Sequence, residues 1–240
     1  AEMAARDPWL VVIEEDNEFD VSRWTHCTTC HQQFTGALKV QMDRRRWRHH
    51  RDRPVSEDRS RALTALALML TRVKEFDMAT HLDEEARRGV ADDDATYHRL
   101  ILPSEMDRAH ALVAVGRPRD ALNILSRVRP WMVQCEDLAL CASYYRALSE
   151  ALLCLGRIED AQPVADEAVE LARTTHGPRS EEAHNAMCCQ AQVIAEIGRV
   201  EEAKETLRHV LATRTRLLGP EHVATCKTQE ALRRIANWTV

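Results

Sequence analysis

The sequence predicts an all-α protein, built as a solenoid of stacked helix pairs. Two observations support this prediction. Ala, Leu, Arg and Glu dominate the 240 residues, whereas 7 Gly, 8 Pro and 5% aromatic residues are too few for the turns and strands of a sandwich or barrel. In addition, one short motif recurs at a nearly constant interval, which is the signature of a repeat protein.

The recurring motif is a Gly followed five residues later by an Ala. It occurs at 116–121, 156–161 and 198–203, and the segment 74–79, which begins with Lys, is a degenerate copy. The four marker alanines, Ala79, Ala121, Ala161 and Ala203, are spaced by 42, 40 and 42 residues. In each copy we expect the Gly to end a first helix and the Ala to lie in the second.

The residues before each marker alanine follow a size pattern. The side chain is small twelve residues before the marker, and it is large and aliphatic nine residues before it. The small residues are Ala67, Ala109, Ser149 and Ala191, and the large ones are Leu70, Leu112, Leu152 and Ile194. A small side chain lets two helices approach closely, and the large one fills the space beside that contact.

This size pattern, with its Gly-x-x-x-[Asp/Glu]-Ala turn, resembles the tetratricopeptide repeat. The segments 175–178 and 218–222 resemble the "LGPEH" loop of the longer repeats of kinesin light chains. The resemblance implies a right-handed superhelix of about four repeats. The first repeat departs from the pattern at Lys74, which replaces the Gly, and at Asp83, which stands where a large apolar residue is usual. The second repeat has Arg108 before the small Ala109, and Pro103 and Pro130 lie near its ends.

The predicted organisation has four parts. They are an extended N-terminal segment with a Cys pair at 1–35, a basic leader helix at 36–57, four repeats at 58–219 and a capping helix at 220–240. A capping element is expected because the last repeat would otherwise expose its core.

The segment 24–36, WTHCTTCHQQFTG, resembles the leader of expanded repeat-protein families in algae and related protists, in which a Cys-x-x-Cys segment precedes the repeats. The resemblance implies a structural Cys pair and no activity. From the residues alone, four interpretations of Cys27 and Cys30 stay open: packing without a cofactor, which we prefer, a zinc site, a redox dithiol and a haem attachment site. Zinc would also need histidines, for which His49 and His50 are candidates. A haem needs an apolar pocket that the surrounding Arg and His residues do not offer.

The basic run at 44–53 contains six Arg and two His. It could meet nucleic acid, an acidic protein or a lipid surface, but Asp43 and Asp52 partly neutralise it. We therefore prefer a solvated helix face, expect no nucleic-acid partner, and keep peripheral association through this helix as an alternative.

No catalytic constellation is recognisable: the chain has no Gly-rich phosphate loop, nucleophile elbow or HExxH motif, so a non-enzymatic role is expected. No apolar run approaches the length of a membrane span. We expect a soluble intracellular protein, either cytoplasmic or, if a transit peptide preceded Ala1, located in a chloroplast or mitochondrion.

The repeat resemblance implies a concave surface lined by the first helix of each pair. Its predicted residues are Arg61, Thr64, Leu68, Met106, His110, Ser143, Arg146, Glu150, Asn185, Cys188 and Gln192. The clamp that grips chaperone tails needs an Asn fourteen residues before the marker, and none of the four repeats has one. We predict a scaffold or adaptor, acting as an assembly factor or bound subunit, that binds another protein or complex. The alternative is a zinc- or haem-binding protein whose repeats dock it to a partner.

Overall fold

The computed structural model of the chain describes residues 32, 36–50, 56–90, 95 and 97–236, and within these residues every regular element is helical. The elements, in chain order, are α1 (Gly36–His50), α2 (Glu57–Arg72), α3 (Phe76–Arg88), a π-helical turn η2 (Tyr97–Ile101), α5 (Leu102–Ala114), α6 (Pro118–Met132), α7 (Leu138–Cys154), α8 (Ile158–His176), α9 (Glu181–Glu196), α10 (Val200–Leu218) and α11 (Val223–Ala236). The prediction of an all-α repeat solenoid is confirmed.

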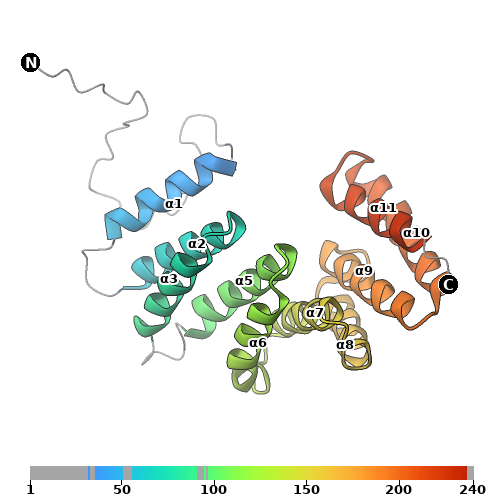
Figure 1. The fold of residues 1–240 in the computed structure, drawn as a ribbon, viewed down its shortest axis with the longest axis horizontal. Helices are drawn as coiled ribbons and strands as arrows, with labels where there is room; N and C mark the ends of the chain where they lie inside the picture. Colours follow the sequence, from blue (N-terminus) through green and yellow to red (C-terminus); the bar gives the residue numbers. More distant parts are fainter. Residues whose placement is uncertain (1–31, 33–35, 51–55, 91–94, 96, 237–240) are drawn as a thin grey trace, which may run out of the picture.

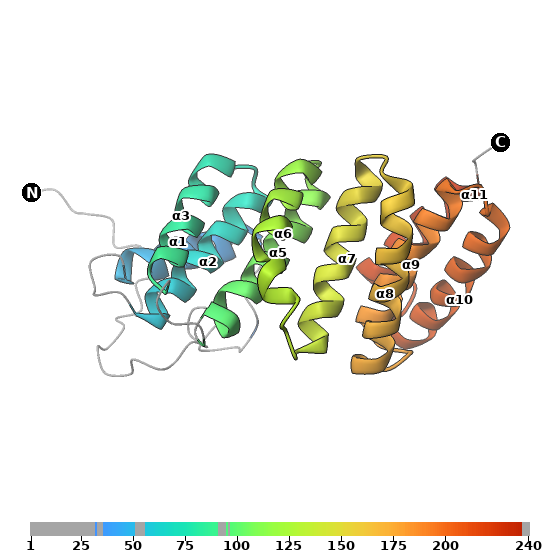
Figure 2. The ribbon, with the colours of Figure 1, turned by 90° about the horizontal axis from the view of Figure 1, so that it is seen from below.

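The helices form successive antiparallel pairs, α2/α3, α5/α6, α7/α8 and α9/α10, with α1 before the first pair and α11 after the last. The pairs stand side by side (Figure 2) and follow an arc with α1 and α11 at its two ends (Figure 1). Each hydrophobic cluster contains residues of neighbouring helices only, such as α5, α6 and α7. The core is therefore a chain of small clusters, as expected for a solenoid.

The close helix contact predicted at the marker alanines is present in every pair. All four marker alanines have 0% exposed surface, and the small residues twelve positions earlier are also buried. In the third pair, the Ser149 hydroxyl donates to the Ala161 carbonyl over 3.4 Å, so a side chain of α7 touches the backbone of α8. Any larger side chain at either position would hold the two helices apart.

The turn between the two helices has the same backbone geometry in all four pairs. Gly116, Gly156 and Gly198 adopt positive φ angles of 83°, 72° and 96°, and the residue after each glycine donates its N–H to the carbonyl five positions back. Lys74 takes the glycine's place in the first pair, and its φ is 67°. Because a side chain is disfavoured in this conformation, the surrounding contacts of the pair must hold the lysine there.

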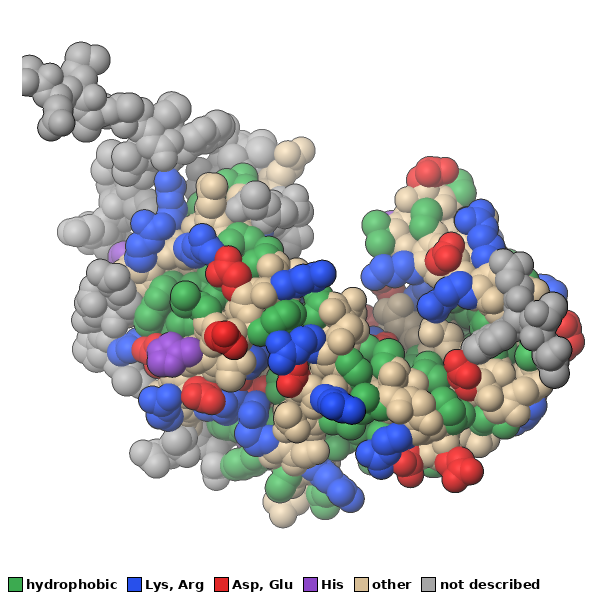
Figure 3. Space-filling model, viewed as in Figure 1, with side chains coloured by type: hydrophobic (Ala, Val, Ile, Leu, Met, Phe, Trp, Pro, Cys, Tyr) green, Lys and Arg blue, Asp and Glu red, His purple; other side chains and the backbone are tan. Residues whose placement is uncertain are grey.

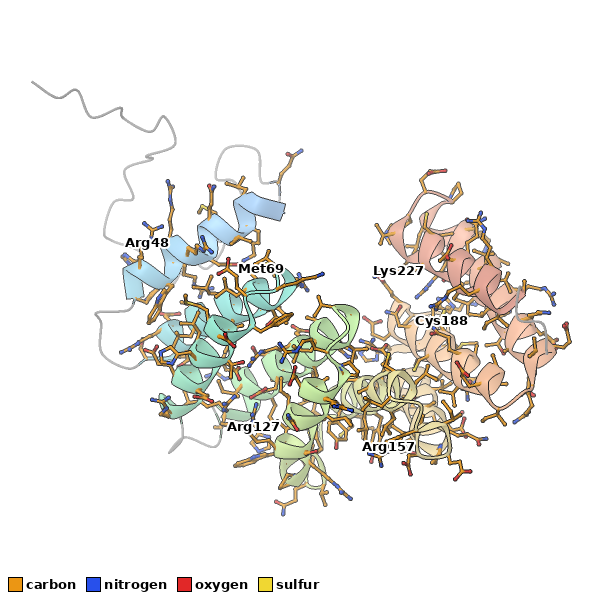
Figure 4. The ribbon with its side chains drawn as sticks, in the orientation of Figure 1. Arg48, Met69, Arg127, Arg157, Cys188 and Lys227 are labelled. Carbon is orange, nitrogen blue, oxygen red and sulfur yellow. The ribbon has the colours of Figure 1, made fainter. Side chains whose placement is uncertain are left out.

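Helix α1 packs on α2 through a partly polar face. Asp43, Arg46 and His50 are buried, Trp47 contacts the hydrophobic cluster of α2 and α3, and Met69 lies on the side of α2 that faces α1 (Figure 4). Burial raises the pKa of Asp43, against the opposing effects of its neighbours Lys39 and Arg46. The prediction that the basic run lies on a solvated helix face is therefore wrong for Arg46 and His50, because both are buried where α1 packs on α2.

The predicted leader helix at 36–57 is too long at its C-terminal end. Helix α1 ends at His50, and Glu57 already belongs to α2, where the side chain of Ser56 caps the helix by accepting the N–H of Arg59. Residues 51–55 lie outside the described residues. The Ser56 cap satisfies a backbone donor that would otherwise lack a partner, which explains why a new helix begins here.

Two carboxylates are buried between the first and second pairs. Glu105 of α5 has no exposed surface, and Asp83 of α3 is also buried. Asp83 lies four residues after its marker alanine, where the second and fourth pairs have the fully buried Leu125 and Leu207. A buried carboxylate at this position needs a cationic partner, because its desolvation is otherwise strongly unfavourable.

Three arginines supply that compensation from three helices. Arg108 Nη1 of α5 lies 2.5 Å from Asp83 Oδ2, and Arg127 Nη2 of α6 donates to both carboxylate oxygens of Glu105 over 2.7 and 2.9 Å. Arg87 of α3 donates to Glu105 over 2.8 Å and also pairs with Asp83. Two of the departures from the repeat pattern, Asp83 and Arg108, thus belong to one ionic network that joins the first two pairs.

We predict that Asp83→Leu destabilises the protein by about 3 kcal/mol or more, although leucine is the residue found in two other repeats. The substitution leaves the buried Arg108 guanidinium without its carboxylate. Adding Arg108→Leu, which matches Leu66 and Leu148 at the equivalent positions, should restore at least half of the loss. Urea unfolding followed by circular dichroism measures both changes, and a stable Asp83→Leu single variant would contradict the role of the network.

Candidate partner-binding surface

The first helices of the pairs, α2, α5, α7 and α9, line the inner side of the arc (Figure 1). In the space-filling view the surface is hollowed between the two arms of the arc (Figure 3). Three positions of each first helix, eighteen, fifteen and eleven residues before the marker alanine, contain all eleven predicted surface residues. We call these three positions the inner columns.

Four predicted residues come together where α5 meets α7. His110 Nδ1 donates to Glu150 Oε2 over 3.0 Å, and His110 Nε2 lies 3.3 Å from Ser143 Oγ. Arg146 Nη1 donates to Glu150 Oε1 over 2.7 Å. All four side chains are only partly buried, so this cluster combines hydrogen-bonding groups of two adjacent repeats at the protein surface.

Glu150 is the anionic centre of this cluster. Burial alone would raise the pKa of its carboxyl, but the hydrogen bond from His110, the charge of Arg146 and the charge of His110 together outweigh burial and lower the pKa to about 2. The carboxylate therefore stays ionised at any physiological pH. It fixes His110 and Arg146 in place.

The inner columns continue onto α11, which the prediction treated as a cap. Lys227, Glu230 and Arg234 lie 42 residues after Asn185, Cys188 and Gln192, and all three are exposed. Arg234 Nη2 contacts Gln192 Oε1 at 3.5 Å, and Lys227 reaches from α11 towards the hollow (Figure 4). The 42-residue interval, added to the inner-column positions of α9, identifies these three residues in the sequence.

Two of the predicted surface residues are not available to a partner. Met106 is 1% exposed, because its long side chain packs into the cluster formed by α5, α6 and α7. Thr64 is also buried, and its hydroxyl donates to the Arg61 carbonyl over 3.2 Å. Leu68 is partly buried, and Arg61 pairs with Glu57 of its own helix. The useful part of the inner columns therefore runs from His110 to α11.

Two of the four residues of the predicted zinc site lie outside the described residues. Cys27 and Cys30 are not among them, whereas His49 is exposed on α1 and His50 is buried. Within the described part of the chain, no group of three or more His, Cys, Asp or Glu side chains is arranged to hold a metal ion. A zinc site at the Cys pair remains a prediction from the sequence.

We predict that the His110–Glu150–Arg146 cluster makes the protein sensitive to acid. The folded pKa of Glu150 lies below its unfolded value, so its stabilisation is present above about pH 4.5 and is lost as the pH falls towards 2. Urea unfolding at a series of pH values should show a loss of up to about 3 kcal/mol from this group. Glu150→Gln should remove that part of the pH dependence, and an unchanged profile in the variant would contradict the assignment.

The geometry defines a helical-repeat protein with a polar inner surface, and comparison with known proteins specifies the kind of repeat. The tetratricopeptide repeat family matches residues 141–182 and 191–224. The chain thus carries tetratricopeptide repeats, as its sequence pattern predicted. None of the curated proteins matches the sequence.

Solved structures share the fold at low sequence identity. BtubC (BKLC) from P. vanneervenii is 18% identical, with a TM-score of 0.63 over 82% of this chain and 78% of that one. The putative kinesin light chain repeat protein of Podosopora anserina is 22% identical, with a TM-score of 0.58 over 77% and 87% of the two chains. A single-residue variant of that protein is 21% identical to this chain, with a TM-score of 0.55 over 78% of this chain and 87% of the variant. These similarities confirm the fold, including the predicted likeness to kinesin light chain repeats.

Among the described residues, no helix is both long enough and apolar enough to cross a lipid bilayer.

Proposed function

We propose that this protein is a non-enzymatic scaffold or adaptor that binds a segment of another protein along its inner columns, as an assembly factor or a bound subunit of a larger complex. The presence of tetratricopeptide repeats supports a role in protein binding. The fold supplies a curved surface, and the residues on that surface determine what it binds.

The observation that carries the proposal is the cluster of His110, Ser143, Arg146 and Glu150. These side chains come from two repeats, are only partly buried, and combine donors and acceptors within one patch. An extended peptide presents backbone N–H and C=O groups that need such partners when they leave water. Gln192 and Arg234 extend the same polar surface towards the end of the arc.

A matched pair of double variants tests the proposal. Arg146→Ala with Gln192→Ala removes two groups of the inner columns, whereas Arg157→Ala with Gln134→Ala removes the same residue types elsewhere; Arg157 lies on the outer side at α8 (Figure 4). Each protein is used for affinity purification from the native source with quantitative mass spectrometry. We expect the specific partner of the wild type to be depleted at least about tenfold by the inner pair and retained by the outer pair.

The opposite pattern would contradict the proposal. If the outer variant loses the partner and the inner variant keeps it, the binding surface lies on the second helices. Circular dichroism of both variants checks that neither change has unfolded the repeats.

A further inference from the structure

The junction of α9, α10 and α11 differs in chemistry from the equivalent junction one repeat earlier. Where α7, α8 and α9 meet, the contact is apolar, and its buried residues are Val169 and five alanines: Ala142, Ala168, Ala172, Ala183 and Ala186. The residues 42 positions later are His184, Val210, Arg214, Thr225 and Thr228, and all five are buried. An apolar contact has thus been replaced by a polar one that includes a charged group.

Arg214 is the centre of this polar junction. It lies eleven residues after its marker alanine, where the other repeats have the buried apolar residues Val90, Met132 and Ala172. Only 3% of Arg214 is exposed, and its side chain runs from α10 between α9 and α11. A charged side chain is therefore an exception at this position of the repeat core.

The guanidinium of Arg214 is held by neutral acceptors. Nη1 donates to Thr228 Oγ1 over 2.7 Å and to the Ala224 carbonyl over 3.2 Å, and Nη2 donates to Asn185 Oδ1 over 2.6 Å. Cys188 Sγ lies 3.8 Å from Nη1. Among the described residues, no carboxylate lies within ion-pair distance of Arg214, so its charge is buried without a counter-charge.

Three further polar atoms of the junction lack partners. Arg214 Nε, His184 Nε2 and Thr225 Oγ1 are buried without a hydrogen bond. Burial, followed by the charges of Arg214 and His209, lowers the pKa of His184, so this ring adds no compensating interaction for the arginine. By comparison, the arginines between the first two pairs meet two carboxylates, which shows how this fold accommodates a buried cation when the contact is complete.

The polar junction opens onto the inner columns. Asn185 and Cys188 are inner-column residues and only partly buried, and they cover the guanidinium from that side. Lys227 is exposed beside them, and Cys188 and Lys227 both lie on the inner side of this arm (Figure 4). The other charged residues of the columns here are the exposed Glu230 and Arg234 of α11, and Glu230 has no ion pair with Arg214.

We propose that the mouth formed by Asn185, Cys188 and Lys227 is the docking site for a carboxylate of an acidic partner segment, which pairs with Arg214. The inference rests on the proposed role of the inner columns and names the chemistry of the partner. Asn185 turns outwards when the ligand arrives, and the carboxylate takes the place of its amide oxygen at Nη2. The incoming charge supplies the counter-ion that the buried arginine lacks, while Lys227 attracts the segment from solvent.

The binding test uses a capped peptide of alternating Glu and Ala residues, its twin with Gln in place of Glu, and isothermal titration calorimetry. We expect the wild-type protein to bind the Glu peptide at least about tenfold more tightly than the Gln peptide. Arg214→Met should abolish that preference, because methionine matches Met132 of the second repeat. Arg157→Met, on the outer side, should leave it unchanged. A wild type that does not distinguish the peptides, or an Arg214→Met variant that still does, overturns the inference.

Thermal unfolding separates this role from a structural one. If Arg214 serves binding and not stability, the Arg214→Met variant should fold. Its melting temperature should be higher than that of the wild type by about 2 °C or more, because the substitution removes a buried cation that has no counter-charge. A lower melting temperature would assign Arg214 to stability. The Arg214→Met variant could still retain a native partner that the Arg146→Ala/Gln192→Ala variant loses. That result would contradict this inference but support the proposed function.

Discussion

The contact between the two helices of each pair at the marker alanine is the constraint on which the rest of the structure depends. Because these alanines have no exposed surface and face a small residue on the partner helix, no large side chain separates the two backbones there. In the third pair the approach brings Ser149 within hydrogen-bonding distance of the Ala161 carbonyl. This spacing, repeated about every forty residues, sets the curvature that directs the first helices towards the inside of the arc.

Much of this arrangement could be predicted from the sequence, because the close helix contact requires small residues at fixed positions of each repeat. Counting from the marker alanine located the turns and the inner columns, but it did not predict the contact between His110 and Glu150, which the fold makes across two repeats. The same count cannot show how deeply a side chain sinks into the core. Met106 occupies an inner-column position but fills a space beside α7, and only the packing of neighbouring helices decides that.

Departures from the repeat pattern were harder to interpret than the pattern itself. Asp83 and Arg108 were visible as exceptions, but their meaning depends on Glu105, Arg87 and Arg127, which the fold brings together from three helices. Arg214 was missed, although the apolar residues at the same position in the other repeats give a signal in the sequence.

Charged side chains are buried at two places in the core, and the two places differ in whether the charges are paired. This difference bears on function. Between the first two pairs, two carboxylates and three guanidiniums satisfy one another, so the network fastens one repeat to the next. At the last junction a single guanidinium has only neutral partners among the residues that the structure describes, and it lies next to the inner columns. The first arrangement is complete within the chain, whereas the second holds the charge that we propose a partner neutralises.

The central claim is that the inner columns on α5, α7 and α9 form the partner-binding surface. Hydrogen–deuterium exchange of the protein alone and with its purified native partner tests this claim most directly, because it reports on every helix at once. Binding along the inner columns should slow exchange in α5, α7 and α9 more than in α6, α8 and α10. Protection confined to α6, α8 and α10 would place the partner on the outer side of the arc and contradict the claim.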